Sequence, residues 1–374
     1  MTEFAVRFPS ALAGIASVYL IYLIVFELFK DKKLSLISAF VASITPWLIY
    51  FSRGAWEVNV ALALTLTGIY FFLKSLQNPK FLTFASASFA LTLVAYQGAK
   101  LSTGIVVLIL LVTYWKDFWK IDRKSLRLSL VVGILVSLPI IFSLFQGKAG
   151  RLSVFSVFSY RRPEAYLQAF LDQGNEKVGS VSYYFSHSES VNFLRGILGR
   201  YFNHFSGRFL FFEGDWGNPR HSAPNSGVLL LSDLVVLLFG LTIALRNKIK
   251  KEHLFVFLWL LASPLPAVLS RDQIHAVRAL NMVIPLIIII SYGYAKISKW
   301  FYVFTALAFI YFLDSYFVHV PKHDSKYWEY GYKQIVETVT PIMGNYKKVK
   351  VQQSFAQPYI YFLFFQKYDP VNGP

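Results

Sequence analysis

Residues 11–33 read ALAGIASVYLIYLIVFELFKDKK, and this stretch decides the fold. Its first nineteen residues carry a single charge, Glu27, and three lysines follow within the next four positions. A helix of about 20 apolar residues matches the thickness of the hydrocarbon core of a bilayer. Lysines placed directly after such a run are typical of the cytoplasmic end of a membrane span. The stretch therefore predicts a membrane-spanning helix.

The composition of the whole chain agrees with a membrane protein. Of its 374 residues 55% are hydrophobic and 15% are charged, whereas a soluble domain has about 25% charged residues. The net charge of +17 would suggest nucleic acid as a partner of a soluble protein. Here the basic residues cluster between apolar stretches, so we expect no nucleic acid partner. The chain has no cysteine, so nothing depends on a disulfide or a thiolate.

The apolar pattern recurs along the chain and predicts an all-α polytopic protein with about ten spans. Backbone groups in lipid must be hydrogen-bonded internally, so the spans are expected to be helices. The predicted spans are residues 11–29, 34–51, 57–75, 80–96, 101–115, 127–145, 227–245, 253–270, 276–295 and 300–317.

The basic residues of the short loops predict the orientation. Five alternate loops hold sixteen Lys and Arg residues, from Lys30 to Lys299, and the other short loops hold four. The richer set is expected to be cytoplasmic. The four residues on the other side are Arg53, Lys100, Arg271 and Arg278.

Two long segments then lie outside the cytoplasm. We expect residues 1–317 to form the transmembrane module, with a large outer loop at 146–226, and residues 318–374 to form a small extracytoplasmic α/β segment. That segment is predicted to hold a helix near 325–340, a strand near 347–353 and an aromatic run at 359–365. Within the outer loop, 189–206 has apolar residues at helical spacing and predicts a helix that lies at the membrane surface or packs on the protein itself.

The first two outer loops offer a carboxylate and two cations. Glu57 opens a predicted span, where an acid also favours a helix N-terminus, and we expect it to line an outward cavity paired with Arg53. The loop with Gln97 and Lys100 follows, and Lys100 could serve as a snorkelling anchor or face an anionic head group.

Two later outer segments are richer in polar chemistry. The stretch 213–224 holds Asp215, Arg220 and His221 among turn-forming residues and fits a phosphate or sugar site. The short loop 270–278 holds Asp272, His275 and Arg278 on the side that basic residues usually avoid, which favours anion binding. His221 and His275 belong to no spaced ligand motif, so no metal ligand is assigned. A divalent cation stays open as a cofactor.

Together the outer loops fit a substrate with a phosphate leaving group and a hydroxyl acceptor. A carboxylate would take the proton of the acceptor, and cations would stabilise the departing phosphate. A lipid-linked sugar phosphate fits a site at the level of the head groups.

Four stretches in order resemble family-39-type glycosyltransferases, the relatives of dolichyl-phosphate-mannose protein mannosyltransferases and of the lipid A aminoarabinose transferase. They are residues 3–14, 45–57, 214–221 and 272–278. The resemblance implies a GT-C fold in the plasma membrane, and an inverting hexosyl or pentosyl transfer from a polyprenyl-phosphate donor on the extracytoplasmic face. It implies that Glu57 is the second acidic position of the site. It also implies that the donor head group or the acceptor is contacted by Arg220, His221, His275 and Arg278.

The resemblance also implies an incomplete site. The principal acid of the family lies in a first outer loop, after a first span and usually in an acidic pair. Glu3 is the only acid before the first predicted span and does not match that pair. We therefore expect a piece of a longer protein that lacks the first span, the first outer loop and the rest of the outer domain after Pro374.

Three other functions fit part of the pattern. A transporter or flippase for lipid-linked sugars would place polar residues near the midplane, often in two related halves, and neither feature is visible. A polymerase or ligase of surface glycans would share the donor class and the large outer loop. The third alternative is a non-catalytic membrane scaffold, which applies if the segment that carries the principal acid is truly absent.

Overall fold

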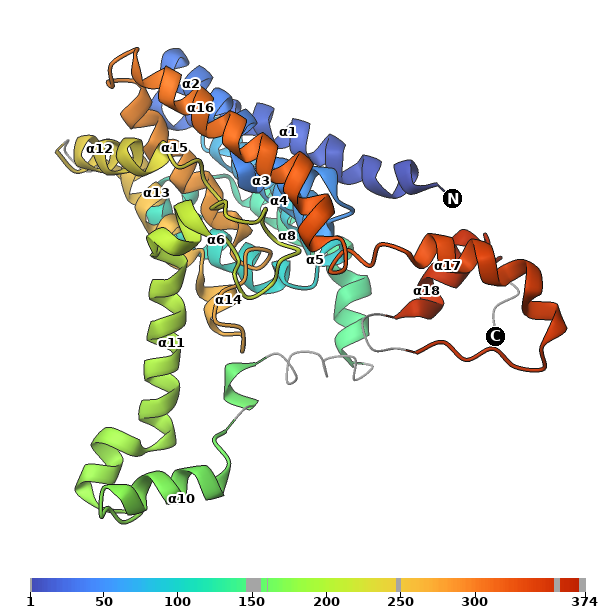
Figure 1. Cartoon of the computed structure of the whole chain (residues 1–374). Coiled ribbons are helices and arrows are strands. Elements are labelled where there is room, and N and C mark those ends of the chain that lie inside the picture. The colour runs from blue at the N-terminus through green and yellow to red at the C-terminus, as the bar shows by residue number, and fades with distance from the viewer. Residues whose placement is uncertain (1, 146–155, 160, 247–249, 353–356, 370–374) are drawn as a thin grey trace.

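The computed structural model describes residues 2–145, 156–159, 161–246, 250–352 and 357–369 (Figure 1). Within these ranges the chain is a helical bundle, and its β pairing is an isolated bridge between Ser156 and Ser270. The predicted all-α polytopic fold is therefore confirmed. The helices are α1 (Glu3–Phe29), α2 (Lys32–Ile44), α3 (Pro46–Arg53), α4 (Glu57–Ser75), α5 (Phe81–Ala95), α6 (Ala99–Thr113), α7 (Trp115–Phe118), α8 (Arg123–Phe145), η1 (Val157–Ser159), α10 (Glu164–Gln173), η2 (Tyr183–His187), α11 (Glu189–Phe205), η3 (Arg208–Phe212), α12 (Asp233–Arg246), α13 (Lys251–Ala262), α14 (Leu265–Val268), η4 (Leu280–Met282), α15 (Val283–Tyr294), α16 (Phe301–Asp314), η5 (Ser315–Asp324), α17 (Tyr332–Val339), η6 (Thr340–Asn345) and α18 (Pro358–Phe365).

Helices lie at all ten predicted span positions, but they differ in length. In the described part of the chain, four helical stretches are long and apolar enough to cross a membrane, and the bent pair α2–α3 would make a fifth. α5 and α6 have 15 residues each, which is about 22 Å of helix against a hydrocarbon core of about 30 Å. The count of ten spans therefore stays a prediction. The four stretches are Glu3–Phe29, Glu57–Ser75, Arg123–Ser143 and Phe301–Asp324.

The break between α2 and α3 shapes the end of the bundle at which α4 begins. Pro46 begins α3, and the two helix axes differ by 55°. Because proline cannot continue the helix, the next backbone N–H, that of Trp47, is free to donate to the carbonyl of Val228 (3.0 Å). The break thus ties α3 to the segment that follows the large outer loop.

Close packing of small residues holds α1, α3 and α4 together near this end. The Ser10 hydroxyl donates to the Phe51 carbonyl (2.9 Å), and the Asn59 side-chain amide donates to the Ser10 carbonyl (2.8 Å). A Cβ atom on Gly14 would lie 2.6 Å from the Cβ of Ser52, so only glycine fits there. These contacts fix the turn from Arg53 to Glu57 relative to α1.

α15 forms the centre of the bundle. Eleven of its twelve residues are buried, and it packs against α12, α2 and α13. A helix that is apolar all round belongs in a core or a membrane. α8 and α16, in contrast, expose many large apolar side chains, as surfaces in contact with lipid do.

The C-terminal segment differs from its predicted α/β form. α17 lies within the predicted helix near 325–340, but residues 346–352 form no strand, and the aromatic run is helical, as α18. Residues 353–356 lie outside the described part of the chain. A strand needs a neighbouring strand to satisfy its backbone groups, and the described residues offer none here. Figure 1 shows this segment projecting from the bundle beside the N-terminus.

The large outer loop contains a helical arm. α11 coincides with the helix predicted at 189–206, and with α10 it projects from the bundle (Figure 1). Leu194 and Leu198 on α11 are exposed, while the other end of the helix docks on the bundle. There the Tyr201 hydroxyl donates to the Leu261 carbonyl (2.9 Å). Residues 146–155, which begin the predicted loop, lie outside the described residues.

Candidate functional site

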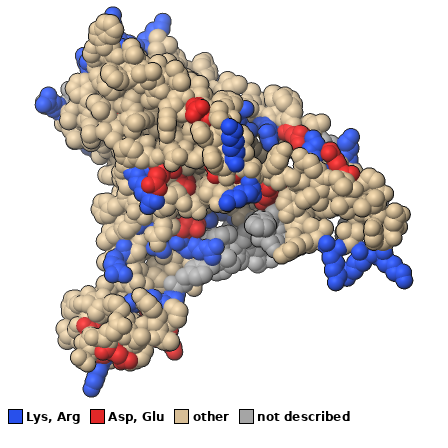
Figure 2. Space-filling model, in the orientation of Figure 1, with Lys and Arg blue, Asp and Glu red and all other residues tan. Residues whose placement is uncertain are grey.

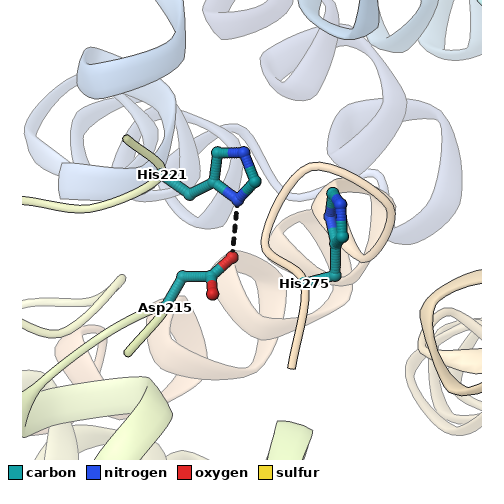
Figure 3. Close-up of side chains that lie close together, drawn as sticks. All are labelled: Asp215, His221 and His275. Atoms are coloured by element: carbon teal, nitrogen blue, oxygen red, sulfur yellow. Dashed lines mark hydrogen bonds and ion pairs between the residues drawn. The ribbon is translucent and has the colours of Figure 1, made fainter. Parts of the chain in front are cut away.

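A tight loop after η3 brings His221 back onto Asp215. Gly214 turns the chain with a φ of +67°, a conformation that favours glycine. Asp215 accepts a hydrogen bond from the Asn218 backbone N–H (3.1 Å), and His221 Nδ1 then lies 2.7 Å from Asp215 Oδ2 (Figure 3). The Ser222 hydroxyl accepts from the Asp215 backbone N–H (2.9 Å). The loop thus places a buried carboxylate against a buried imidazole.

The 271–278 loop closes over this pair. The Ala276 backbone N–H donates to Asp215 Oδ2 (2.8 Å), and the His221 and His275 rings lie 4.9 Å apart between centroids. Figure 3 shows His275 beside the Asp215–His221 pair. Asp215 and Ala276 are 61 residues apart in the sequence, so two distant loops share one carboxylate.

Charged residues of the 271–278 loop lie next to the two histidines. The Arg278 guanidinium donates to Asp272 Oδ2 (2.7 Å), and His275 Nε2 lies 4.0 Å from the same oxygen. The Asp272 carboxylate remains about a third exposed. The arrangement leaves a cation–carboxylate pair next to the buried histidines.

Burial keeps His275 neutral. It lowers the pKa of His275 to about 2, with further lowering by the positive charge of Arg278. The backbone N–H of Arg278 donates to His275 Nδ1 (3.3 Å), which leaves the proton of the neutral ring on Nε2.

Sequence reasoning missed His204, which supports the site from α11. Its Nδ1 donates to the Arg200 carbonyl (2.7 Å), and its Nε2 accepts from the His275 backbone N–H (3.4 Å). Burial lowers the pKa of His204, so the ring is neutral. The sequence offered one clue to this residue: His204 lies one position away from the apolar stripe of the helix predicted at 189–206.

Asp215, His221 and His275 could hold a metal ion. Each offers one ligand atom, and these atoms lie within 4.8 Å of one another. Carboxylate and imidazole ligands suit zinc and other divalent ions. Asp215 Oδ2 already serves His221 and Ala276, so an ion would have to replace the Asp215–His221 hydrogen bond.

Arg220 lies at the junction of the site with the C-terminal segment. Its guanidinium lies 5.8 Å from the ring centres of both Trp56 and Trp328, and 3.9 Å from the Glu329 carboxylate. The Trp56 ring in turn lies 5.6 Å from that of His221. The two tryptophans and Glu329 were not singled out in the sequence, because nothing local predicts that residues near 56, 220 and 328 meet.

Glu57 lies at the rim of the site, but the predicted pairing with Arg53 is wrong. The described residues contain no ion pair between them, and the Arg53 guanidinium instead lies over the rings of Tyr316 (5.1 Å) and Phe317 (4.5 Å). Arg53 ends α3 and Glu57 begins α4, so the turn between them abolishes the helical spacing of four residues. Glu57 is exposed, and both it and Arg278 act electrostatically on the Tyr96 hydroxyl.

Gln97 and Lys100 lie beside this rim without a defined role. Gln97 is exposed in the turn before α6, and Lys100 is half-buried in the first turn of that helix. The structure gives neither side chain a contact with the Asp215 cluster. It does bring together Asp215, Arg220, His221, Asp272, His275 and Arg278.

Residues 1–142 match the family model described as dolichyl-phosphate-mannose-protein mannosyltransferase. This range contains 3–14 and 45–57, so the resemblance predicted from the sequence is confirmed there. The stretches 214–221 and 272–278 lie outside it.

A solved structure and the curated proteins complete the comparison. The chain is similar to the crystal structure of the Archaeoglobus fulgidus oligosaccharyltransferase in the apo form, with 16% identity and a TM-score of 0.43. The match covers 95% of this chain and 50% of that chain, so this chain spans about half its length. No curated protein matches the sequence.

Proposed function

We propose that the chain is part of a membrane glycosyltransferase of the GT-C type, which transfers a hexosyl or pentosyl group from a polyprenyl-phosphate donor to a hydroxyl acceptor. The observation that carries this proposal is the cluster of Asp215, His221, His275, Asp272 and Arg278. This cluster lies beside the end of α4 that bears Glu57, because Val58 and Arg278 line the same small cavity. α4 belongs to residues 1–142, the part of the chain that matches the mannosyltransferase family. The site would face the extracytoplasmic side of the plasma membrane.

The chemistry requires a base and a group that stabilises the leaving phosphate. The acceptor oxygen attacks the anomeric carbon, its proton passes to a carboxylate, and the bond from that carbon to the phosphate oxygen breaks with inversion. Glu57 is exposed and offers an accessible carboxylate for the acceptor side. Arg278 and Arg220 offer guanidinium groups for the phosphate that leaves with the bonding electrons.

The buried part of the site would act by positioning. Asp215 and His204 together hold the backbone at His275 and Ala276, three and two residues before Arg278. A fixed loop keeps the guanidinium at one place relative to Glu57, and a misplacement of about 1 Å can cost roughly a hundredfold in rate. A divalent ion at Asp215, His221 and His275 would supply further positive charge for the phosphate.

The test is transfer of labelled sugar from polyprenyl phosphate in membranes that contain the longest natural form of the protein. We expect Arg278→Ala to lower transfer by about a hundredfold or more, because it removes the charge that stabilises the leaving phosphate. Glu57→Gln should lower transfer similarly. Arg195→Ala, which alters an exposed arginine on α11, should retain it.

Undiminished transfer in both Arg278→Ala and Glu57→Gln would remove this assignment. Movement of the labelled lipid across the membrane without transfer of its sugar would favour the flippase alternative instead.

A further inference from the structure

A second cavity lies at the opposite ends of the helices that carry the outer site. It has a volume of about 240 Å³ and lies among the ends of α1, α4, α6–α7 and α13. α4 begins at Glu57 and reaches the cavity 19 residues later, which is about 28 Å of helix. The lining residues are Glu27, Leu28, Leu73, Leu76, Gln77, Tyr114, Asp117, Lys251 and Glu252.

The cavity carries charges of both signs. α1, α4 and α6 all present their C-terminal ends to it, and the C-terminal end of a helix carries partial negative charge. Among the charged lining residues, three are carboxylates and one is a lysine. The three C-terminal helix ends favour a positively charged ligand group, while Lys251 at the start of α13 can receive a negatively charged one.

Two of the three carboxylates are already neutralised by lysines. Glu27 bonds to Lys30 and, at 2.6 Å, to Lys74. Asp117 bonds to Lys120 (3.2 Å) and Lys251 (2.7 Å). The third carboxylate, Glu252, has no ion pair within the described residues, so it is the group left to receive a cation.

A buried hydroxyl without a partner marks the same place. Tyr114 lines the cavity, its side chain is 3% exposed, and its hydroxyl has no hydrogen-bond partner among the described residues. The Tyr114 ring lies 5.3 Å from the Lys251 ammonium and lines the cavity together with Asp117 and Glu252. A buried hydroxyl left unpaired costs free energy, and a ligand that donates a hydrogen bond to it removes that cost.

The size and remaining lining define the ligand. A cavity of about 240 Å³ is smaller than the roughly 300–1,000 Å³ of sites for drug-sized ligands. The Lys251 ammonium, which also bonds to Asp117, is about half exposed and lies 5.3 Å from the Tyr114 ring, so an anionic group can bind to its remaining donors beside the cationic one. We propose that this cavity binds a phosphoethanolamine group, with its ammonium on Glu252 and Tyr114 and its phosphate on Lys251. Such a group can come from a membrane lipid or from the free compound.

Native mass spectrometry of the full chain in detergent tests the lipid source. With equimolar phosphatidylethanolamine and phosphatidylcholine, we expect preferential retention of phosphatidylethanolamine by about tenfold, because the trimethylated head group cannot donate to Glu252 or Tyr114. Titration calorimetry with free phosphoethanolamine and phosphocholine tests the other source. Binding of only the lipid or only the free compound supports the site and identifies the source.

Variants locate the binding in the cavity. Glu252→Gln and Tyr114→Phe keep the size of the side chain, and each should weaken binding of phosphoethanolamine or its lipid by about tenfold. Glu337→Gln, in exposed α17, is the matched control and should bind as the unaltered chain does. Equal binding of the ethanolamine and choline forms, or undiminished binding by Glu252→Gln, would overturn the proposal. The comparison of the two head groups uses the unaltered chain and so does not depend on the folding of any variant.

Discussion

At the scale of single residues, Asp215 has the most demanding position in the chain. Its carboxylate is buried and accepts hydrogen bonds from the Asn218 and Ala276 backbone N–H groups while it lies against His221. A buried carboxylate is stable only when such partners replace the water it has lost. The bond from Ala276 joins two loops that are distant in sequence, so the residue that shapes the site also stabilises the fold there.

Asp215→Asn should lower the free energy of unfolding by about 3 kcal/mol. The amide has one acceptor oxygen in place of two, so at least one of the N–H donors around it loses its partner. Thermal unfolding in detergent measures the effect. Glu213→Gln is the control in the same loop, since Glu213 makes an exposed ion pair with Arg208 (2.6 Å) that contributes no more than about 1 kcal/mol. Equal losses in the two variants would contradict this role for Asp215.

Acid should destabilise the histidine cluster. Burial lowers the pKa of His204 and lowers that of His275 to about 2, whereas a histidine in the unfolded chain has a pKa of about 6.5. Below about pH 6.5 the unfolded chain therefore binds protons that the folded chain does not. The stabilisation is complete above that pH and is lost as the pH falls, by at most about 1.4 kcal/mol per pH unit for each group.

Thermal unfolding at about pH 7.5 and about pH 5.5 checks this pH dependence. His204→Gln should lose less stability between the two pH values than the unaltered chain does, because one of the two histidines with a lowered pKa is gone. An equal or steeper loss in the variant would show that His204 is not the source.

At the scale of elements, α12 and α15 pack through glycines. A Cβ atom on Gly240 would lie 2.0 Å from the carbonyl oxygen of Ile289, and one on Gly293 would lie 2.3 Å from that of Val236. Small residues let helix backbones approach closely in membrane proteins. This contact holds α15 at the centre, and the two loops that carry Asp215 and His275 precede α12 and α15 in the chain.

Gly240→Ala should therefore destabilise the protein by about 1–3 kcal/mol, since the helices must separate to admit the methyl group. Gly104→Ala provides the opposite control, because a Cβ atom there meets nothing within 4 Å and alanine favours a helix by up to about 1 kcal/mol. The melting temperature should fall for the first variant and rise slightly for the second. A tolerated Gly240→Ala would mean that the two helices are not in close contact.

The positions of helices could be predicted from the sequence, but their lengths and breaks could not. Apolar periodicity reports burial or lipid contact, which places helices at the ten predicted sites. It does not report where Pro46 bends a span or which helices stop short of the membrane thickness. The predicted strand failed for a related reason, since residues 347–352 have strand-like composition but no neighbouring strand in the described chain.

Only part of the site could be predicted from the sequence, because the sequence does not report which distant segments meet. Loop charge placed Asp215, His221, His275 and Arg278 on one face, and the structure brings them together. His204 and Trp328 were missed because only the tertiary fold carries α11 and the C-terminal segment to the same place. Conversely, the Arg53–Glu57 pair was expected because the two lie only four positions apart in the sequence, and the turn between α3 and α4 does not bring them together.

At the scale of the whole molecule, two sites lie at opposite ends of the same helices. Glu57 begins α4 beside the outer site, while Leu73 and Leu76 near its end line the second cavity. α6 makes the same connection from Lys100 to Tyr114. Figure 2 shows Lys and Arg at the end of the bundle where α2 and α12 lie, and acidic and basic residues mixed over the centre of this face. The two proposed sites are therefore separated along the length of these helices.

The most direct measurement of this claim is the accessibility of single introduced cysteines, because the chain has no cysteine of its own. Gln273→Cys places a thiol on the exposed loop of the outer site, and Lys116→Cys places one on an exposed position near the second cavity. A membrane-impermeant maleimide should label Gln273→Cys in intact cells and label Lys116→Cys only after the membrane is permeabilised. Labelling of Lys116→Cys but not Gln273→Cys in intact cells, or of both, would contradict the orientation on which the proposed function rests.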